Sequence, residues 1–159
     1  MLAEPQNRIS QKALTVWRIS GVIRVIIEWS IAAVAIFLLN LFEGPKWISI
    51  ILIALGVIFT LLHIFILPSL RWKRWRYEVR EEEMELQEGI FVRTRTLVPM
   101  VRVQHVDTVQ GPILRKYNLA SVIVHTAATA HTIPALDETE AEELRRYISK
   151  LARMVEEDV

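Results

Sequence analysis

The sequence contains no cysteine, and it has almost no excess of charge of either sign. The first absence excludes disulfide bonds, iron–sulfur clusters, thiolate zinc sites and cysteine nucleophiles, and it is compatible with a reducing compartment. The 19 Lys and Arg residues nearly balance 18 Asp and Glu residues, which leaves a formal net charge of +1. We expect no nucleic-acid partner, because no recognised motif is present and residues 78–88 are strongly acidic.

Apolar residues are what the sequence has in excess, and they are concentrated in its first half. They make up 52% of the 159 residues, and the mean hydropathy is +0.30. Residues 47–67 form a run of 21 residues without a charged side chain, which as a helix would be about 31 Å long. That length crosses the hydrocarbon core of a bilayer. An earlier apolar run covers residues 21–42, and Gly44 and Pro45 break the chain between the two runs.

These runs predict a two-helix transmembrane hairpin over residues 21–67, with spans at about 21–42 and 47–67 and with Pro68 ending the second helix. Residues 1–20 precede it as a polar N-terminal segment, and the first run is too long for a cleaved signal peptide. Lys and Arg residues are abundant on both outer flanks, whereas Lys46 is alone in the connecting loop. The positive-inside rule therefore predicts a multi-pass protein of the cell membrane with both termini in the cytoplasm.

Residues 68–159 form a candidate cytoplasmic domain that is mainly β in pattern. Apolar residues alternate with polar ones over several short segments, as in Met84 and Leu86 or Val122 and Val124, and this period of two is typical of strands. The last segment changes period and predicts one amphipathic helix. Its apolar stripe consists of Leu144, Ile148, Leu151 and Val155. The predicted class is α+β: several antiparallel strands followed by a C-terminal helix.

The chain also resembles a known family, through one series of short motifs. These are Val98-Pro99-Met100-Val101-Arg102-Val103-Gln104-His105-Val106-Asp107, then Gln110-Gly111-Pro112, then Arg115-Lys116-Tyr117-Asn118-Leu119-Ala120. The series, together with two preceding spans, resembles the bacterial pleckstrin-homology-like (PH-like) membrane proteins of the YdbS-like type. The resemblance implies a bent antiparallel sheet or partly open barrel, closed at one end by the C-terminal helix. It implies no catalytic residue.

The resemblance also implies partners. Members of this type look like partners of larger membrane proteins with repeated PH-like domains, and a homo-oligomer is the other option. A role in envelope stress or antimicrobial defence is implied by association. Eukaryotic relatives of the fold often bind phosphoinositides at their first hairpin loop, but the acidic turn Glu81-Glu82-Glu83 would repel such a head group here.

A basic–tryptophan flank directly follows the second span and is the candidate lipid-binding site. It consists of Arg71, Trp72, Lys73, Arg74, Trp75 and Arg76. Each cation near an anionic leaflet contributes about 1 kcal/mol, and tryptophan favours the membrane interface. A positive-inside flank that binds no particular lipid is an alternative for the same residues, and so is a docking site for a partner.

Two further groups are candidate partner-binding residues. Arg24 and Glu28 lie four residues apart at the start of the first span, so they can pair with each other or contact a partner's helix. The second group is a polar set that could frame an anion or peptide groove in the domain. It consists of Arg93, Arg95, Arg102, Gln104, His105 and Gln110. Solvated strand faces, balanced by the nearby glutamates, are the alternative.

The remaining polar residues predict neither catalysis nor a metal site. His105, His125, His131 and Asp107 could together bind zinc, but they lack short ligand spacing and fall in separate predicted strands. Ser121, His105 and Asp107 include the residue types of a hydrolytic triad without a motif that would orient them. We therefore expect no enzyme and no cofactor. A non-catalytic membrane-anchored adaptor is the preferred function, and an anionic-lipid-binding module at the inner leaflet is the alternative.

Overall fold

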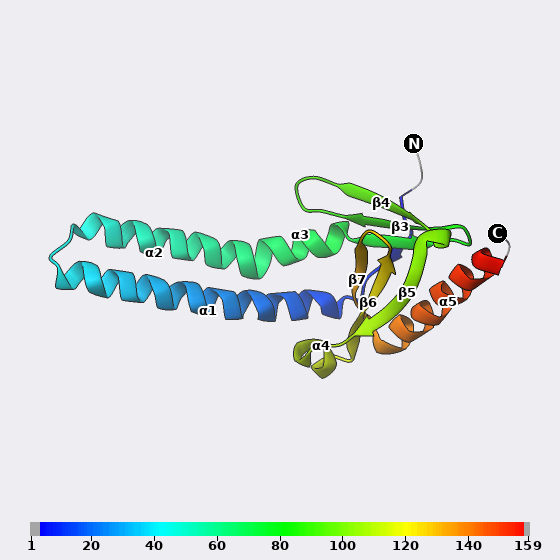
Figure 1. Ribbon diagram of the computed structural model, residues 1–159. Coiled ribbons are helices and arrows are strands. Elements are labelled where there is room, and N and C mark those ends of the chain that lie inside the picture. The colour runs from blue at the N-terminus through cyan, green and yellow to red at the C-terminus, as the bar shows by residue number, and fades with distance from the viewer. Residues whose placement is uncertain (1–3, 158–159) are drawn as a thin grey trace. The chain divides into compact units, whose positions relative to one another are not determined.

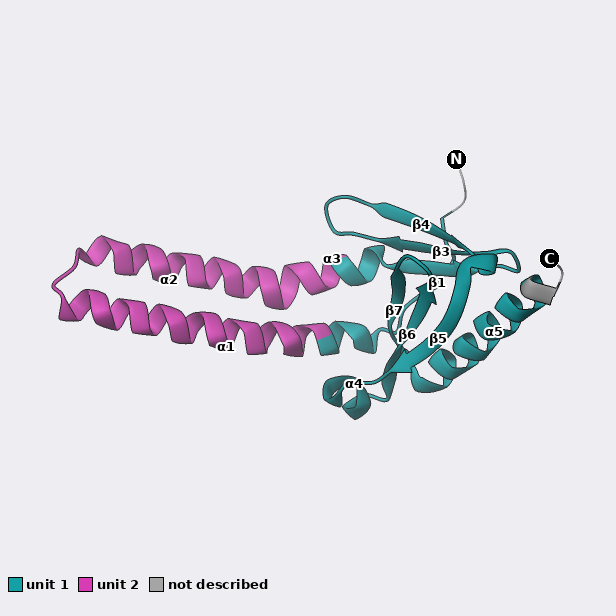
Figure 2. Cartoon of the chain, in the orientation of Figure 1, with its two compact units in different colours: residues 1–16, 71–159 teal, residues 17–70 magenta. Residues whose placement is uncertain are grey.

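The computed structural model describes residues 4–157 and divides into two compact units (Figure 2). One unit consists of residues 17–70, and the other consists of residues 71 onward together with the described residues up to Val16. Residues 1–20 are predicted from the sequence as a segment of their own. The structure instead includes residues on the N-terminal side of the first long helix in the β domain.

The first unit is built from two long apolar helices. α1 covers Lys12–Leu41, and the second helix consists of α2 (Lys46–Leu61), the π-helical η1 (Leu62–Ile66) and α3 (Leu67–Arg74). Both helices are long and apolar enough to cross a membrane, and almost none of their apolar surface is buried within the molecule. A helix that is apolar on all sides and exposed needs an apolar surrounding, which a bilayer supplies.

The prediction that Pro68 ends the second helix is wrong, because the helix continues to Arg74. A proline inside an α-helix clashes with the carbonyl group four residues earlier and lacks the N–H group that would bond it. Here the wider π-helical turn of η1 ends at Ile66, two residues before Pro68. This turn changes the backbone spacing where the clash would arise, so the helix passes through the proline.

The β domain contains two antiparallel sheets (Figure 1). The first has the strand order β1-β2-β3-β4, and the second has the order β5-β6-β7. The strands are β1 (Asn7–Arg8), β2 (Arg76–Val79), β3 (Glu83–Glu88), β4 (Thr94–Pro99), β5 (Val103–Val109), β6 (Leu119–Thr126) and β7 (Ala130–Asp137). Three helical elements complete the domain: the 3-10 turn η2 (Met100–Arg102), α4 (Pro112–Lys116) and α5 (Glu138–Glu157). The predicted PH-like class, β sheets followed by a C-terminal helix, is confirmed.

Apolar side chains from both sheets meet in one core, which α5 covers. Met84, Met100, Leu119, Ile133 and Ile148 have essentially no exposed surface. α5 packs against η2, β5, β6 and β7. The predicted stripe of this helix is confirmed at Ile148 and Leu151, which are buried, because residues spaced three and four apart share one helix face.

The N-terminal segment forms part of the domain. β1 pairs antiparallel with β2, so that Asn7 lies opposite Tyr77 and Arg8 lies opposite Arg76. Ile9, Ala13 and Val16, which follow β1, are buried. The backbone N–H group of Ser10 donates to the carbonyl group of Ala135 in β7, at 3.2 Å. Ile9 and the first turns of α1 thus complete a core whose other residues follow the second long helix.

Candidate functional site

The basic–tryptophan flank forms the last turn of α3 and the start of β2, and its residues have different roles. Trp75 departs from the lipid-binding expectation: it is only 2% exposed and packs in the core beside Tyr77. Trp72 is partly buried, and its indole N–H group donates to the carbonyl group of Ser10 at 3.1 Å. Lys73 is exposed. Trp75 lies two residues before Tyr77 on extended chain, so both side chains project into the core. The flank therefore offers its cations and at most one tryptophan to an anionic surface.

The predicted arginines of β4 and its loop lie in an ion-pair network on the outer face of the first sheet. Arg93 pairs with Glu4 at 3.3 Å, and Glu4 also pairs with Arg76 of the flank at 3.5 Å. Arg95 pairs with Glu85 of β3, which is only 5% exposed. Alternation alone places Glu85 in solvent, but the arginine side chains cover it.

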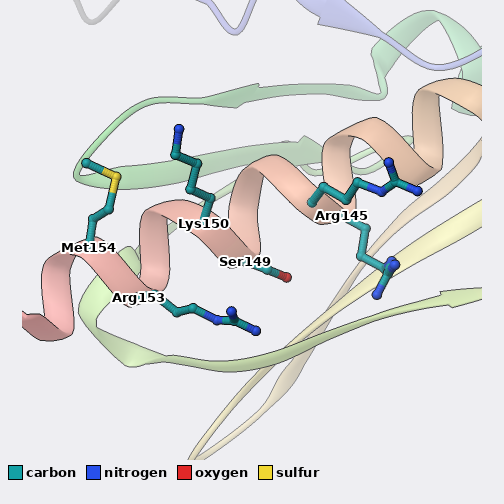
Figure 3. Close-up of a pocket in the computed structure, with 6 residues that line it drawn as sticks. Arg145, Ser149, Lys150, Arg153 and Met154 are labelled. Carbon is teal, nitrogen blue, oxygen red and sulfur yellow. The ribbon is translucent and has the colours of Figure 1, made fainter.

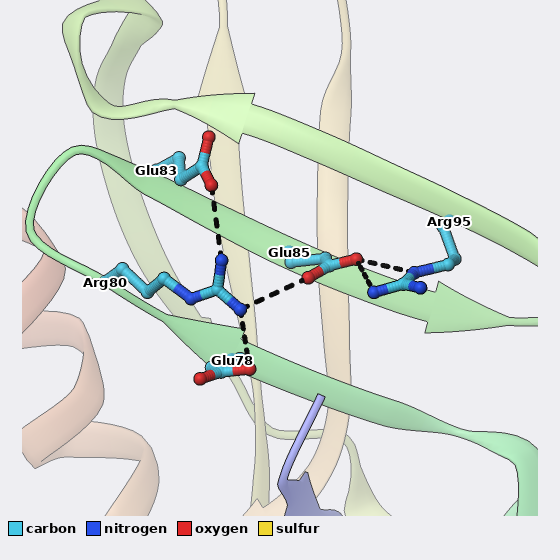
Figure 4. Close-up of polar contacts among 5 residues, drawn as sticks. All are labelled: Glu78, Arg80, Glu83, Glu85 and Arg95. Atoms are coloured by element: carbon cyan, nitrogen blue, oxygen red, sulfur yellow. Dashed lines mark hydrogen bonds and ion pairs between the residues drawn. The ribbon is translucent and has the colours of Figure 1, made fainter. Parts of the chain in front are cut away.

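Arg80 extends this network along the turn between β2 and β3 (Figure 4). Its guanidinium group lies 3.1 Å from Glu78, 3.4 Å from Glu83 and 3.6 Å from Glu85. The hydrogen bond to Glu78 is the main reason that the pKa of Arg80 is raised. The carboxylates that surround Arg80 thus leave this face with little excess charge of either sign. Arg93 and Arg95 are consequently engaged inside the domain and are less available to a ligand than the sequence predicts.

Arg102 and Gln104 lie beside a groove of about 500 Å³. Its walls come from the end of β4, from η2, from the start of β5 and from the β6–β7 turn at residues 127–129. Leu97 and Val101 line it and are 50% and 52% exposed. β4 is the outer strand of its sheet, so the groove adjoins a strand edge. We call this surface the β4 groove.

The other two residues of the predicted polar set lie elsewhere. Gln110 has a structural role, because its side-chain amide donates to the carbonyl group of Leu119 at 2.9 Å and joins the ends of β5 and β6. His105 stacks on His125 of β6, with ring centroids 4.3 Å apart. The structure therefore brings Arg102 and Gln104 together but does not gather the six residues in one groove.

Two surfaces were missed by the sequence analysis. The loop between β3 and β4 presents Phe91 and Val92, which are 86% and 77% exposed. The sequence carries a signal for this loop, because three apolar residues, Ile90, Phe91 and Val92, directly follow Gly89. In the structure Gly89 has a φ of +110°, a conformation that favours glycine. Arg74 of the flank donates to the carbonyl group of Ile90 in the same loop.

The second missed surface is a basic face of α5 (Figure 3). It surrounds a shallow pocket of about 390 Å³ lined by Arg145, Arg146, Ser149, Lys150, Arg153 and Met154. Arg145 and Arg146 both bond Glu142, which lowers the pKa of that carboxyl group. The spacing of these cations along one helix is visible in the sequence.

Arg24 and Glu28 lie in the helical unit. Among the residues that the structure describes they form no ion pair with each other, although their spacing would allow one. Glu28 instead borders an apolar pocket of about 360 Å³ between α1 and α2, together with Trp29, Gly56 and Phe59. The indole N–H group of Trp29 donates to Thr60 at 3.0 Å, and this bond links the two helices.

The fold and these surfaces define a class of protein: a PH-like β domain joined to two helices of membrane-spanning length. The chain belongs to the bacterial PH domain family, whose model matches residues 18–152. It is 50% identical over all 159 residues to the UPF0699 transmembrane protein YdbS of Bacillus subtilis (strain 168), and the match covers the full length of both chains. These matches support the membrane location and the predicted family resemblance.

A second relative is longer. The chain is 26% identical over 102 residues to the UPF0699 transmembrane protein YdbT of the same organism. That match covers 62% of this chain but only 20% of YdbT. No solved structure matches the chain.

Proposed function

We propose that this protein is a non-catalytic, membrane-anchored adaptor whose PH-like domain faces the cytoplasm and binds an extended segment of a partner membrane protein along β4. The observation that carries the proposal is the β4 groove. It combines a strand edge, exposed Leu97 and Val101, and the polar side chains of Arg102 and Gln104. An added strand would bond the backbone of β4, and its alternate side chains would enter the groove.

The chemistry of the groove indicates the kind of segment that fits. Its apolar wall suits an aliphatic or aromatic side chain, and Arg102 suits a carboxylate beside it. The arginines of the neighbouring sheet face are already paired with Glu4 and Glu85, so specificity rests on the groove. We infer a larger membrane protein with PH-like domains as the partner. The match to a fifth of YdbT supports this inference, because a chain of that length has room for further domains.

The three residues of triad type, Ser121, His105 and Asp107, are arranged in a way that supports a non-catalytic role. The hydroxyl group of Ser121 accepts a hydrogen bond from the backbone of Ala135, at 3.2 Å, which engages it in the β-sheet. Asp107 and His105 lie on the neighbouring strand and are exposed. The three residues form no hydrogen-bonded relay, which a hydrolytic triad requires.

Affinity purification of the full chain from native membranes tests the proposal. Leu97→Arg combined with Val101→Arg should release the partner, with a loss of about 2 kcal/mol, or roughly thirtyfold in affinity, as at other interface centres. Val109→Arg is the control, because Val109 is, like Leu97, an exposed apolar residue on an outer strand. A partner that stays bound to the groove variant, or that is lost equally from the control, contradicts the proposal.

Contact with anionic lipid is the second candidate function, and the exposed tip at Phe91 and Val92 favours it. Apolar side chains at the end of a loop that Arg74 contacts and Arg93 directly follows match an anionic membrane interface. Because the chain has no cysteine, Phe91→Cys can carry a single polarity-sensitive dye. In nanodiscs the dye should shift to the blue with anionic lipid but not with zwitterionic lipid, and a dye at Thr108→Cys should not respond. Equal spectra from the two positions would leave the adaptor as the better account.

The physiological setting that we propose for the adaptor is defence of the cell envelope. Deletion of the gene should then raise sensitivity to membrane-active antimicrobial agents. The groove variant should behave like the deletion, whereas Val109→Arg should restore resistance. Survival curves of the four strains measure this.

A further inference from the structure

Three metal-ligating side chains from two neighbouring strands meet on the surface of the second sheet. They are His105 and Asp107 of β5 and His125 of β6. His105 lies directly opposite His125 in the strand register, and Asp107 lies two residues further along the same strand. Side chains two apart on a strand share a face, so all three project from the same side of the sheet.

A β-bulge creates this arrangement. Val103 pairs with Thr126 while His105 pairs with His125, so β5 holds one extra residue, Gln104, at this point. Without the extra residue, Gln104 would lie opposite His125 and His105 would project from the other face. Bulges commonly redirect side chains next to functional sites. The bulge is not visible in the sequence, where His105 and His125 fall in separate predicted strands and therefore predict no metal site.

The ligand atoms lie somewhat further apart than around a bound first-row transition metal. The Nε2 atoms of His105 and His125 lie 3.8 Å and 3.4 Å from the same carboxylate oxygen of Asp107, and one ligand atom from each residue lies within 4.8 Å of the others. Bonds of about 2.0–2.1 Å in a tetrahedral site hold adjacent ligand atoms about 3.3 Å apart. The rings of the two histidines are nearly parallel, with an angle of 12° between them. Small side-chain rotations would bring the three atoms to that spacing.

We propose that His105, Asp107 and His125 form a binding site for a divalent transition-metal ion of the zinc class. Two imidazole nitrogens and one carboxylate oxygen suit Zn²⁺ and are too few oxygens for Ca²⁺ or Mg²⁺. The side chains are exposed or half-buried, so a fourth position is open to water or to a donor from another molecule. The site is separate from the β4 groove and does not depend on the proposed adaptor function.

The surroundings of the site set its expected affinity. Arg145 of α5 is the nearby cation, since the charge of Asp107 contributes to the raised pKa of Arg145, although less than the bond to Glu142 does. His105 also borders a small pocket with Arg145 and Arg153. A positive charge at this distance opposes a divalent ion. We therefore expect Arg145→Gln to strengthen binding, an effect that a merely structural role of the cluster would not produce.

His131 supplies the matched control. It lies on β7, opposite Val124 in the register and therefore on the other face from His125. Its Nε2 atom is 2.9 Å from the hydroxyl group of Thr129. A metal ion that binds histidines without a defined site would respond to the loss of His131 as much as to the loss of His105.

The test is a titration of the full-length protein in nanodiscs, purified through a tag without histidine or cysteine and freed of metal with a chelator. Calorimetry with Zn²⁺ should show one bound ion per chain, and Co²⁺ should give the visible absorption of a low-symmetry site. His105→Ala, His125→Ala and Asp107→Asn should each weaken binding by at least about tenfold, because even changes outside the ligand set have such effects. His131→Ala should bind normally.

Circular dichroism of the metal-free variants separates a lost ligand from a lost fold. The three side chains are on the surface, so the variants should keep the wild-type spectrum. Binding should also weaken at acidic pH, because protons compete for the imidazole nitrogens. The absence of saturable Zn²⁺ binding to the wild-type chain, or equal losses in His131→Ala and His105→Ala, would overturn the proposal.

Discussion

Tyr77 is a polar side chain inside the core, at the point where the first sheet meets α5. It is 3% exposed, and its hydroxyl group donates to the carboxylate of Glu140, at 2.9 Å, in the first turn of the helix. Burial, and then the bond to Glu140, raises the pKa of Tyr77 above its usual range. The phenol therefore stays protonated and remains a donor throughout the physiological pH range.

Replacing this donor gives a prediction at the scale of one residue. Tyr77→Phe should lower the free energy of unfolding by about 1–1.5 kcal/mol, because the bond to Glu140 is lost. Hydrogen exchange of the first turns of α5 should rise, and Tyr147→Phe, on the exposed side of the same helix, should leave it unchanged.

The pH dependence of this difference follows from the direction of the pKa shift. A group whose pKa is raised on folding contributes its stability below its unfolded pKa, which is about 10 for tyrosine, and loses it as the pH rises further. The difference between Tyr77→Phe and wild type should therefore be constant around neutral pH and shrink above about pH 10. A difference that grows at alkaline pH would contradict the assigned donor.

At the scale of an element, two glycines set how closely the long helices approach each other. A Cβ atom on Gly21 would lie 2.6 Å from the carbonyl oxygen of His63, in the π-helical segment. A Cβ atom on Gly56 would lie 3.0 Å from the ring of Trp29. Close approach of backbones at small residues is how helices associate in lipid, where no hydrophobic force acts between them.

We therefore predict that Gly21→Ala destabilises the helix pair by about 1–3 kcal/mol, as overpacking usually does. The carbonyl group of His63 is backbone and cannot move aside as a flexible side chain could. SDS titration of the solubilised protein, monitored by tryptophan fluorescence, measures the loss. Gly111→Ala is the control because nothing lies within 4 Å of its added Cβ atom. Equal midpoints for the two variants would show that the helices are not in contact at Gly21.

At the scale of the whole molecule, β1 and β2 tie the two ends of the helical unit together. β1 precedes the first long helix and β2 follows the second, yet they pair in one sheet. A folded domain with strands from both flanks requires both flanks on one side of any membrane that the helices cross. Two crossings satisfy this condition and one does not.

The corresponding prediction concerns topology. A single cysteine in place of Glu43, in the loop between the helices, should react with a membrane-impermeant maleimide added to intact cells. A single cysteine in place of Thr108 should react only after the membrane is opened. The excess of cations on the two flanks predicts this orientation. Labelling of Thr108→Cys in intact cells, with Glu43→Cys protected, would reverse it.

A structural feature could be predicted from the sequence where it depends on residues that are close together along the chain. The apolar runs and the stripe through Ile148 and Leu151 depend on neighbours within a few residues, so these helices were predictable. The burial of Trp75 and Glu85 depends on which strands lie beside them, and the meeting of His105 with His125 depends on a bulge. Pairing between distant strands leaves no periodic trace in the sequence, so these features required the structure.

The pairing of β1 with β2 also has a consequence for how the protein is made. β1 is synthesised before both long helices, whereas its partner strand β2 is synthesised only after them. During that interval the apolar side chains of Ile9 and Val16 have no core to join. Completion of the domain therefore waits until translation has passed both spans, so membrane insertion and folding are ordered in time. If the segment before the first helix and the segment after the second helix were on opposite sides of the bilayer, β1 could not pair with β2 and the domain could not form.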